Sequence, residues 1–333
     1  MGPAAQGRLA PQQPRFGRVA PSSVAAPEAL ARKLPRLGPC LDICFPAMTS
    51  SSVALDPPRA ASASGSVLTG HPTRSRRALD ISAAAWLGIA LIGQLLFAFY
   101  LLRAYAAPTL RGDLQSWNIK LPHGYSPGDH WGNALVGLHL LFALLILVGC
   151  ALQLLPPLRR AVPAFHRWVG RSYLMAAAVL GLGGLMLVWT RPAIGGFGQH
   201  LGISLNALLM LGFAAVAWRA ARARRIQEHR AWALRLFLVV SGVWFFRLGL
   251  PLWLMAWRAP VGFDPQTFSG PFLTALSFAQ TLLPLAVFEL LRWAQRQPRR
   301  GPHRAMAATM ALLCVITVAG IAAAFLMLWR PHL

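Results

Sequence analysis

Four histidines in the middle of the chain are the residues best suited to chemistry. They are His139, His166, His200 and His229, and each lies in or at the edge of a different apolar segment. A neutral imidazole is a common metal ligand and a common axial ligand of haem iron. The thickness of a membrane would separate these histidines, which disfavours a compact zinc or two-metal site for hydrolysis.

The segments that carry the histidines have the length and composition of membrane-spanning helices. Of the 333 residues, 56% are hydrophobic and 12% are charged, whereas soluble domains contain about 25% charged residues. A run of about twenty apolar residues is long enough to cross a bilayer as a helix. We therefore expect an all-α, polytopic membrane bundle of seven helices. Their ranges are 82–102, 132–154, 168–190, 199–218, 232–255, 271–291 and 306–329.

The basic residues alternate between the predicted loops. From Arg74 onward, eighteen arginines lie just before the first span or in and beside the loops that follow the second, fourth and sixth, and six Lys or Arg residues lie on the other side. This asymmetry predicts an N-terminus inside and a C-terminus outside. Membrane insertion and attraction to anionic lipid headgroups therefore explain the net charge of +23, and we expect the lipid bilayer and no nucleic acid as a partner.

The N-terminal part differs in kind from the rest. Residues 1–78 are rich in Pro, Ala and Arg and contain no apolar run, so we expect a disordered tail without a secretory signal. Translation from Met48 is an alternative start. Residues 79–333 form the predicted transmembrane domain, and its histidine-bearing four-helix core is expected at 131–256.

The predicted topology sorts the histidines by depth. His139 and His200 fall in the outer half of spans two and four, and His166 and His229 fall at the inner edge of spans three and five. Two imidazoles from different helices at one depth can hold a b-type haem. A small residue follows each histidine by four positions, which would leave room for the ring: Ala143, Gly170, Ser204 and Ala233. We therefore expect two haem b groups and a transmembrane electron carrier.

Three arginines complete the candidate site. Arg171 and Arg235 could each pair with a haem propionate, or they could only hold their helices at the inner surface. Arg247 lies deeper, in "VWFFRLGLPLW", where the span offers no acidic residue. A propionate of the outer haem or a quinone headgroup would be a suitable partner for it.

Other functions remain open at this point. A histidine at a membrane interface commonly extends to the headgroups without binding a metal. Pro251 and Pro284 could break helices along a transport path, so a non-haem transporter or a scaffold is the alternative. The spans show no internal repeat, and their acids are scarce, with Glu289 close to the inner edge. An oxidoreductase activity and its donor, a quinone or a small-molecule reductant, also remain open.

Two motifs resemble a known family. "HRWVGRSY", which begins at His166, and "EHRAWALRLFL", which contains His229, are similar to stretches of the bacterial membrane family called domain of unknown function 2306. The matching residues are His166, Arg167, Gly170, Arg171, Tyr173, His229, Arg230, Trp232 and Arg235. The resemblance covers about residues 80–295. It implies a protein of the bacterial inner membrane and no particular activity.

The placement of the histidines is similar to a second group, the cytochrome b(561) two-haem membrane carriers. In that group, spans two and four hold one haem, and spans three and five hold the other. This resemblance implies that His139/His200 and His166/His229 are axial ligand pairs. The chain departs from the group by its seventh span and by the lack of a recognisable ascorbate-binding loop, which leaves the substrate open.

Overall fold

The computed structural model describes residues 73–119, 121, 124–190 and 195–332. The tail predicted over residues 1–78 lies outside this part up to residue 72, and residues 74–78 form the start of a helix. Within the described part the chain is helical, apart from an isolated bridge between Asp264 and Ser269. The long helices are α3 (Arg74–Leu101), α5 (His130–Leu154), α7 (Pro163–Thr190), α8 (Phe197–Arg222), α9 (Ile226–Val240), α10 (Gly242–Trp257), α11 (Pro271–Arg296) and α12 (Arg300–Ala324). The short helices are α4 (Ala107–Leu110) and α6 (Pro156–Ala161), with π turns at Leu102–Ala106 and Phe325–Trp329 and 3-10 turns at Gln115–Ile119 and Arg330–His332.

The predicted architecture of a polytopic helical membrane protein is confirmed. In the described ranges, six helices are long and apolar enough to cross a membrane, and the bent pair α9–α10 supplies a seventh span if it is counted as one. The helices extend a few residues beyond the predicted spans, mostly at their arginine-containing ends. Long basic side chains at such ends can keep their charge in the headgroup region while their stems cover apolar surface.

Local sequence signals set several of the helix ends. The carboxylate of Asp129 accepts a hydrogen bond of 2.8 Å from the backbone N–H of Gly132 and caps the start of α5. Proline occupies the first position of α7 and of α11, where no helical N–H bond is lost. Arg258 ends α10 in the left-handed region, with a φ of 53°. These signals fix where the chain turns between spans.

The fifth span is bent, although the sequence predicts one continuous helix over 232–255. It divides into α9 and α10, which meet at 44° around Ser241. The Ser241 hydroxyl donates to the carbonyl of Phe237 and accepts from Gln94 of α3, at 2.7 and 2.8 Å. The side chain of Asn206 donates to the carbonyl of Val239 at 2.9 Å. Side chains thus engage backbone groups at a Ser–Gly pair, a known cause of sharp helix kinks.

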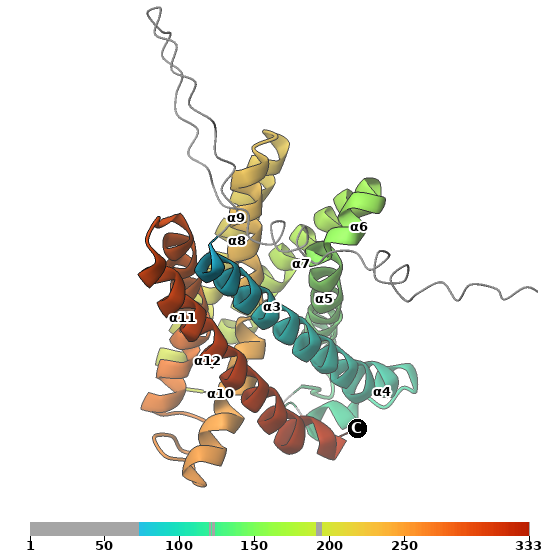
Figure 1. The fold of residues 1–333 in the computed structure, drawn as a ribbon. Helices are drawn as coiled ribbons and strands as arrows, with labels where there is room; N and C mark the ends of the chain where they lie inside the picture. Colours follow the sequence, from blue (N-terminus) through green and yellow to red (C-terminus); the bar gives the residue numbers. More distant parts are fainter. Residues whose placement is uncertain (1–72, 120, 122–123, 191–194, 333) are drawn as a thin grey trace, which may run out of the picture. The chain divides into compact units, whose positions relative to one another are not determined.

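The helices pack in a chain-like order that places the histidine-bearing spans together. In that order α5 packs on α7, α7 on α8 and α8 on α9, and their shared core contains Ile146, Ala176, Ala177, Leu180, Met210, Ala214, Leu236 and Val239. Helices α3 and α12 lie side by side along their length (Figure 1), and α10 and α11 both pack on α12. The four histidine-bearing helices α5, α7, α8 and α9 therefore pack on one another in sequence order, and α10 continues from α9.

The two ends of the bundle differ in charge. We call the end formed by the starts of α3, α7 and α9 and the last turns of α5, α8 and α11 the arginine-rich end. Interactions between neighbouring helices tie this end together, including an Arg76 contact to the carbonyl of Gln295. The opposite end, which contains the starts of α5, α8 and α11, is called the arginine-poor end.

Candidate functional site

The two histidines of one predicted pair both lie at the arginine-rich end. His166 lies in the first turn of α7 and His229 in the first turn of α9, and the two imidazoles are close enough to interact electrostatically. The Nδ1 atom of His229 lies 2.9 Å from the carbonyl oxygen of Ala217 on α8. A carbonyl can only accept, so Nδ1 must carry the proton. The Nε2 atom of His229 is then an acceptor, as it would be in a metal ligand.

The backbone of His166 has a hydrogen-bond partner on a neighbouring helix, but its ring nitrogen Nδ1 does not. Its Nδ1 atom is buried and has no hydrogen-bond partner, while its backbone carbonyl accepts 2.9 Å from the Gln153 amide of α5. The sequence predicts that Gly170 leaves open space beside His166. A Cβ atom at Gly170 would instead lie 3.3 Å from the Gln153 oxygen. The Gln153 side chain thus occupies the space beside Gly170.

The two histidines of the second predicted pair both pack against α7. His139 of α5 lies against α7, where a Cβ atom on either Gly183 or Gly184 would be 3.9 Å from its ring. His200 of α8 instead packs edge-on against Trp189, with ring centroids 5.8 Å apart. Helix α7 therefore lies beside both histidines. Each still has one buried ring nitrogen without a partner, Nδ1 in His139 and Nε2 in His200.

The small residues that were predicted to make room for the ring have other roles. Ser204 accepts a hydrogen bond of 3.0 Å from the indole of Trp189, and Ala143 packs between two apolar clusters. With Gly170 against Gln153, three of the four positions are thus in contact with protein groups. The glycines that lie next to a predicted ligand are Gly183 and Gly184 on the neighbouring helix, a relationship that depends on how α5 and α7 pack.

Arg247 lies in an aromatic surrounding on α10. Its guanidinium lies 5.2 Å from the centre of the Phe97 ring, in cation–π geometry. His139, Tyr100 and Tyr105 are within electrostatic reach. Among the described residues, no carboxylate pairs with Arg247. The arrangement combines a fixed positive charge, two phenols and an imidazole, which suits an anionic or strongly polar ligand group.

The other two predicted arginines have different surroundings. Arg235 pairs with Glu289 of α11 at 2.7 Å and lies 4.5 Å from the centre of the Trp232 ring. Its charge is thus already balanced by a carboxylate of the protein. Arg171 is exposed on α7, and no carboxylate in the described ranges pairs with it. Of these two, Arg171 is the one whose charge is free to meet an added anion.

Two further residues at these helices escaped the sequence prediction. His303, near the start of α12, is buried and neither of its ring nitrogens has a partner. Its sequence setting, a histidine next to arginine before an apolar run, is the same as that of His166 and would have identified it. The hydroxyl of Tyr173 is also buried without a partner. Tyr173 lies one turn after Gly170, in the motif that begins at His166.

The placement of the His, Cys, Asp and Glu side chains excludes a metal site with three protein ligands in the described part of the chain. In the part of the chain that the structure describes, no three His, Cys, Asp or Glu residues cluster as metal ligands. A haem iron requires only two protein ligands, because the macrocycle supplies the rest. The histidines are therefore arranged for two-ligand coordination at most.

Comparison with known proteins shows a similarity to one family over part of the chain. Residues 136–269 match the model of the family described as "Predicted membrane protein (DUF2306)". This stretch contains all four histidines and Arg247, and it supports the first of the two resemblances noted from the sequence. The resemblance to the cytochrome b(561) group has no such support. No curated protein and no solved structure matches the chain. The chain is thus similar to DUF2306 proteins and is an integral, multi-pass membrane protein.

Proposed function

We propose that this protein is a transmembrane electron carrier that holds two haem b groups, one on His166/His229 and one on His139/His200. The observation that carries the proposal is the state of the four imidazoles. Three have a buried ring nitrogen without any hydrogen-bond partner, and the fourth is oriented by Ala217 so that Nε2 can coordinate. Buried polar atoms without partners are uncommon in proteins, and an absent ion or ligand is one reason for them.

The pairing at the arginine-rich end has the better support. His166 and His229 come from different helices, interact electrostatically and lie at the same end of the bundle. Helix α8 orients His229 through Ala217, and α5 holds the backbone of His166 through Gln153. These contacts would keep both rings in position before coordination. Haem, when bound, supplies one-electron transfer between ferric and ferrous iron.

The pair at the arginine-poor end would require a larger adjustment. His139 and His200 lie on helices that both pack on α7, and Trp189 lies against His200. Rotation of Trp189, which is 51% exposed, would release that ring. Arg247, within electrostatic reach of His139, would then compensate a propionate or a quinone headgroup. The apolar cluster around Ile146 and Leu180 lies between the two pairs and would exclude water from the space between them.

An optical spectrum tests this proposal directly. The full chain is expressed with added haem precursor, purified in detergent and examined in oxidised and dithionite-reduced forms. We expect a b-type α-band and a pyridine haemochrome content of about two per chain, the number of histidine pairs. A colourless protein would refute the proposal. The variant His130→Ala, at an exposed position, should keep the wild-type haem content.

A second candidate function, transport of a lipid-soluble molecule, is favoured by one observation. The bent pair α9–α10 and the proline-containing α11 border a cavity at membrane depth. Broken helices commonly line substrate sites in transporters. A colourless protein that still binds a ligand in this cavity would favour transport over electron transfer.

A further inference from the structure

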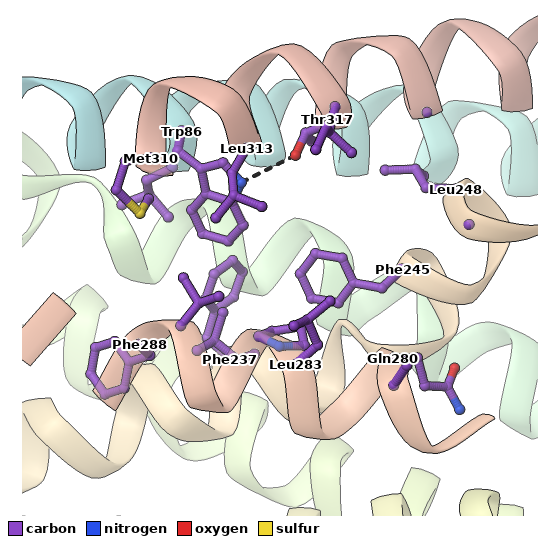
Figure 2. Close-up of a pocket in the computed structure, with 18 of the residues that line it drawn as sticks. Trp86, Phe237, Phe245, Leu248, Gln280, Leu283, Phe288, Met310, Leu313 and Thr317 are labelled. Carbon is purple, nitrogen blue, oxygen red and sulfur yellow. Dashed lines mark hydrogen bonds between the residues drawn. The ribbon is translucent and has the colours of Figure 1, made fainter. Parts of the chain in front are cut away.

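A cavity of about 220 Å³ lies between α3, α9, α10, α11 and α12, away from the four histidines. Aromatic side chains from four helices form much of its wall: Trp86, Phe237, Phe245 and Phe288 (Figure 2). An engineered protein cavity of about 150 Å³ binds benzene. The present cavity is therefore large enough for one substituted ring, and its aromatic walls favour such a ring over a bare alkyl chain.

The cavity opens through the side of the bundle. Leu283 of α11 and Ile316 of α12 both line it, and their side chains are 59% and 42% exposed. Both positions lie in the middle of membrane-spanning helices, so these exposed side chains face lipid. A ligand would enter from the bilayer, and a chain attached to its ring could remain in the lipid.

One polar atom in the cavity wall lacks a partner. The Gln280 side chain is 5% exposed, and its nitrogen donates 3.0 Å to the carbonyl of Ser277. Since that carbonyl can only accept, the amide orientation is fixed, and Oε1 is the atom left without a hydrogen bond. Pro284, four residues later, has no N–H to offer the backbone carbonyl of Gln280. Gln280 therefore presents acceptors and needs a donor.

The other polar group in the cavity is already engaged. The hydroxyl of Thr317 accepts 3.1 Å from the indole of Trp86 (Figure 2). This bond links α3 to α12 across one side of the cavity and holds the Trp86 ring in the wall. A ligand in this cavity would thus have Gln280 as its hydrogen-bond partner and apolar side chains as its other contacts.

We propose that this cavity binds a lipid-soluble molecule with one aromatic ring that carries a hydroxyl group, a phenol or a hydroquinone. The ring packs among Trp86, Phe237 and Phe245, and the hydroxyl donates to Gln280 Oε1 once the amide, which is covered in the ligand-free structure, turns toward the ring. The bond satisfies an acceptor that burial otherwise leaves unmade, which is a strong source of selectivity for a donor. The site does not depend on haem, and its test does not use haem content.

The test compares two probes that differ only at the oxygen. Binding of 4-heptylphenol and of its methyl ether, 4-heptylanisole, is measured by equilibrium dialysis against the full chain in lipid nanodiscs, with empty nanodiscs subtracted. We expect the wild type to bind the phenol at least fivefold more tightly than the ether, because only the phenol donates a hydrogen bond. Equal binding of both probes, or no binding of either, would overturn the proposal.

Two variants locate the site. Gln280→Leu removes the acceptor at similar size and should weaken the phenol about fivefold while leaving the ether unchanged. Ala279→Phe, which fills the cavity from α11, should abolish binding of both probes. Leu290→Phe on the same helix, where the side chain is 55% exposed and does not line the cavity, is the matched control. Wild-type phenol binding in either of the first two variants would contradict the assignment.

Discussion

The Nδ1 atom of His229 and the carbonyl oxygen of Ala217 are 2.9 Å apart, so that α8 orients the histidine of α9. This bond fixes the imidazole tautomer with Nε2 as the lone-pair nitrogen. The His229 imidazole is also within electrostatic reach of His166, whose own Nδ1 is buried and without a partner. The hydrogen bond to Ala217 therefore holds the His229 ring in one orientation.

His166 and His229 should behave as one unit in haem binding. Replacement of either by alanine should remove about half of the haem, and the double variant should lose little more, because residues that serve one site are not additive. Haem content per protein, by pyridine haemochrome, is the measurement. His139→Ala and His200→Ala should form the second unit. Independent effects of His166→Ala and His229→Ala would argue against shared coordination.

The orientation of the bundle is a second prediction. A reporter fused after Arg225, at the arginine-rich end, should be cytoplasmic, and one fused near Asp264, in the loop between α10 and α11, should be external. A phosphatase that is active only outside and a fluorescent protein that is active only inside distinguish the two locations. The reverse pattern at either position would invert the depth assigned to the histidine pairs.

Close packing of α8 against α11 gives a third prediction. A Cβ atom at Gly202 would lie 2.9 Å from the Cβ and 3.0 Å from the carbonyl carbon of Ser277, whereas one at Gly212 would meet nothing within 4 Å. Gly202→Ala should therefore destabilise the protein by about 1–3 kcal/mol through overpacking. Gly212→Ala, on the same helix, should be neutral or stabilise it by up to about 1 kcal/mol.

Thermal unfolding of the two glycine variants in the same detergent is the measurement. A melting temperature that falls for Gly202→Ala and not for Gly212→Ala confirms the packing of the two helices. Equal melting temperatures would show that α8 and α11 are further apart than the structure places them.

Arg247 gives a fourth prediction because it is a cation in a span without a paired carboxylate in the described ranges. Arg247→Met keeps the side-chain length and should raise the melting temperature of the ligand-free protein by a few degrees, since an intramembrane charge is costly. Residues held for binding commonly reduce stability in this way. The same variant should weaken haem retention at His139/His200, as judged by haem content. Lower stability in Arg247→Met would instead assign the arginine a structural role through Phe97.

The sequence by itself determined the class of the protein and its spans. Apolar runs of about twenty residues have one low-energy solution in a bilayer, a helix that satisfies its own backbone hydrogen bonds. Capping residues such as Asp129 and helix-initial prolines such as Pro163 act within a few positions, so the signals for helix ends are present in the sequence, although the predicted spans begin two and five residues after the starts of α5 and α7. His166 and His229 could be paired by depth because depth follows from position along a span.

Only the tertiary structure decided what surrounds those residues. The bend at Ser241 depends on Asn206 and Gln94, which lie on other helices. Gln153 beside Gly170, Trp189 on His200 and Glu289 on Arg235 are likewise contacts between spans. A membrane-spanning helix is apolar on most of its faces, so hydropathy does not reveal which face packs against which neighbouring helix. Small residues and polar contacts between helices decide it instead.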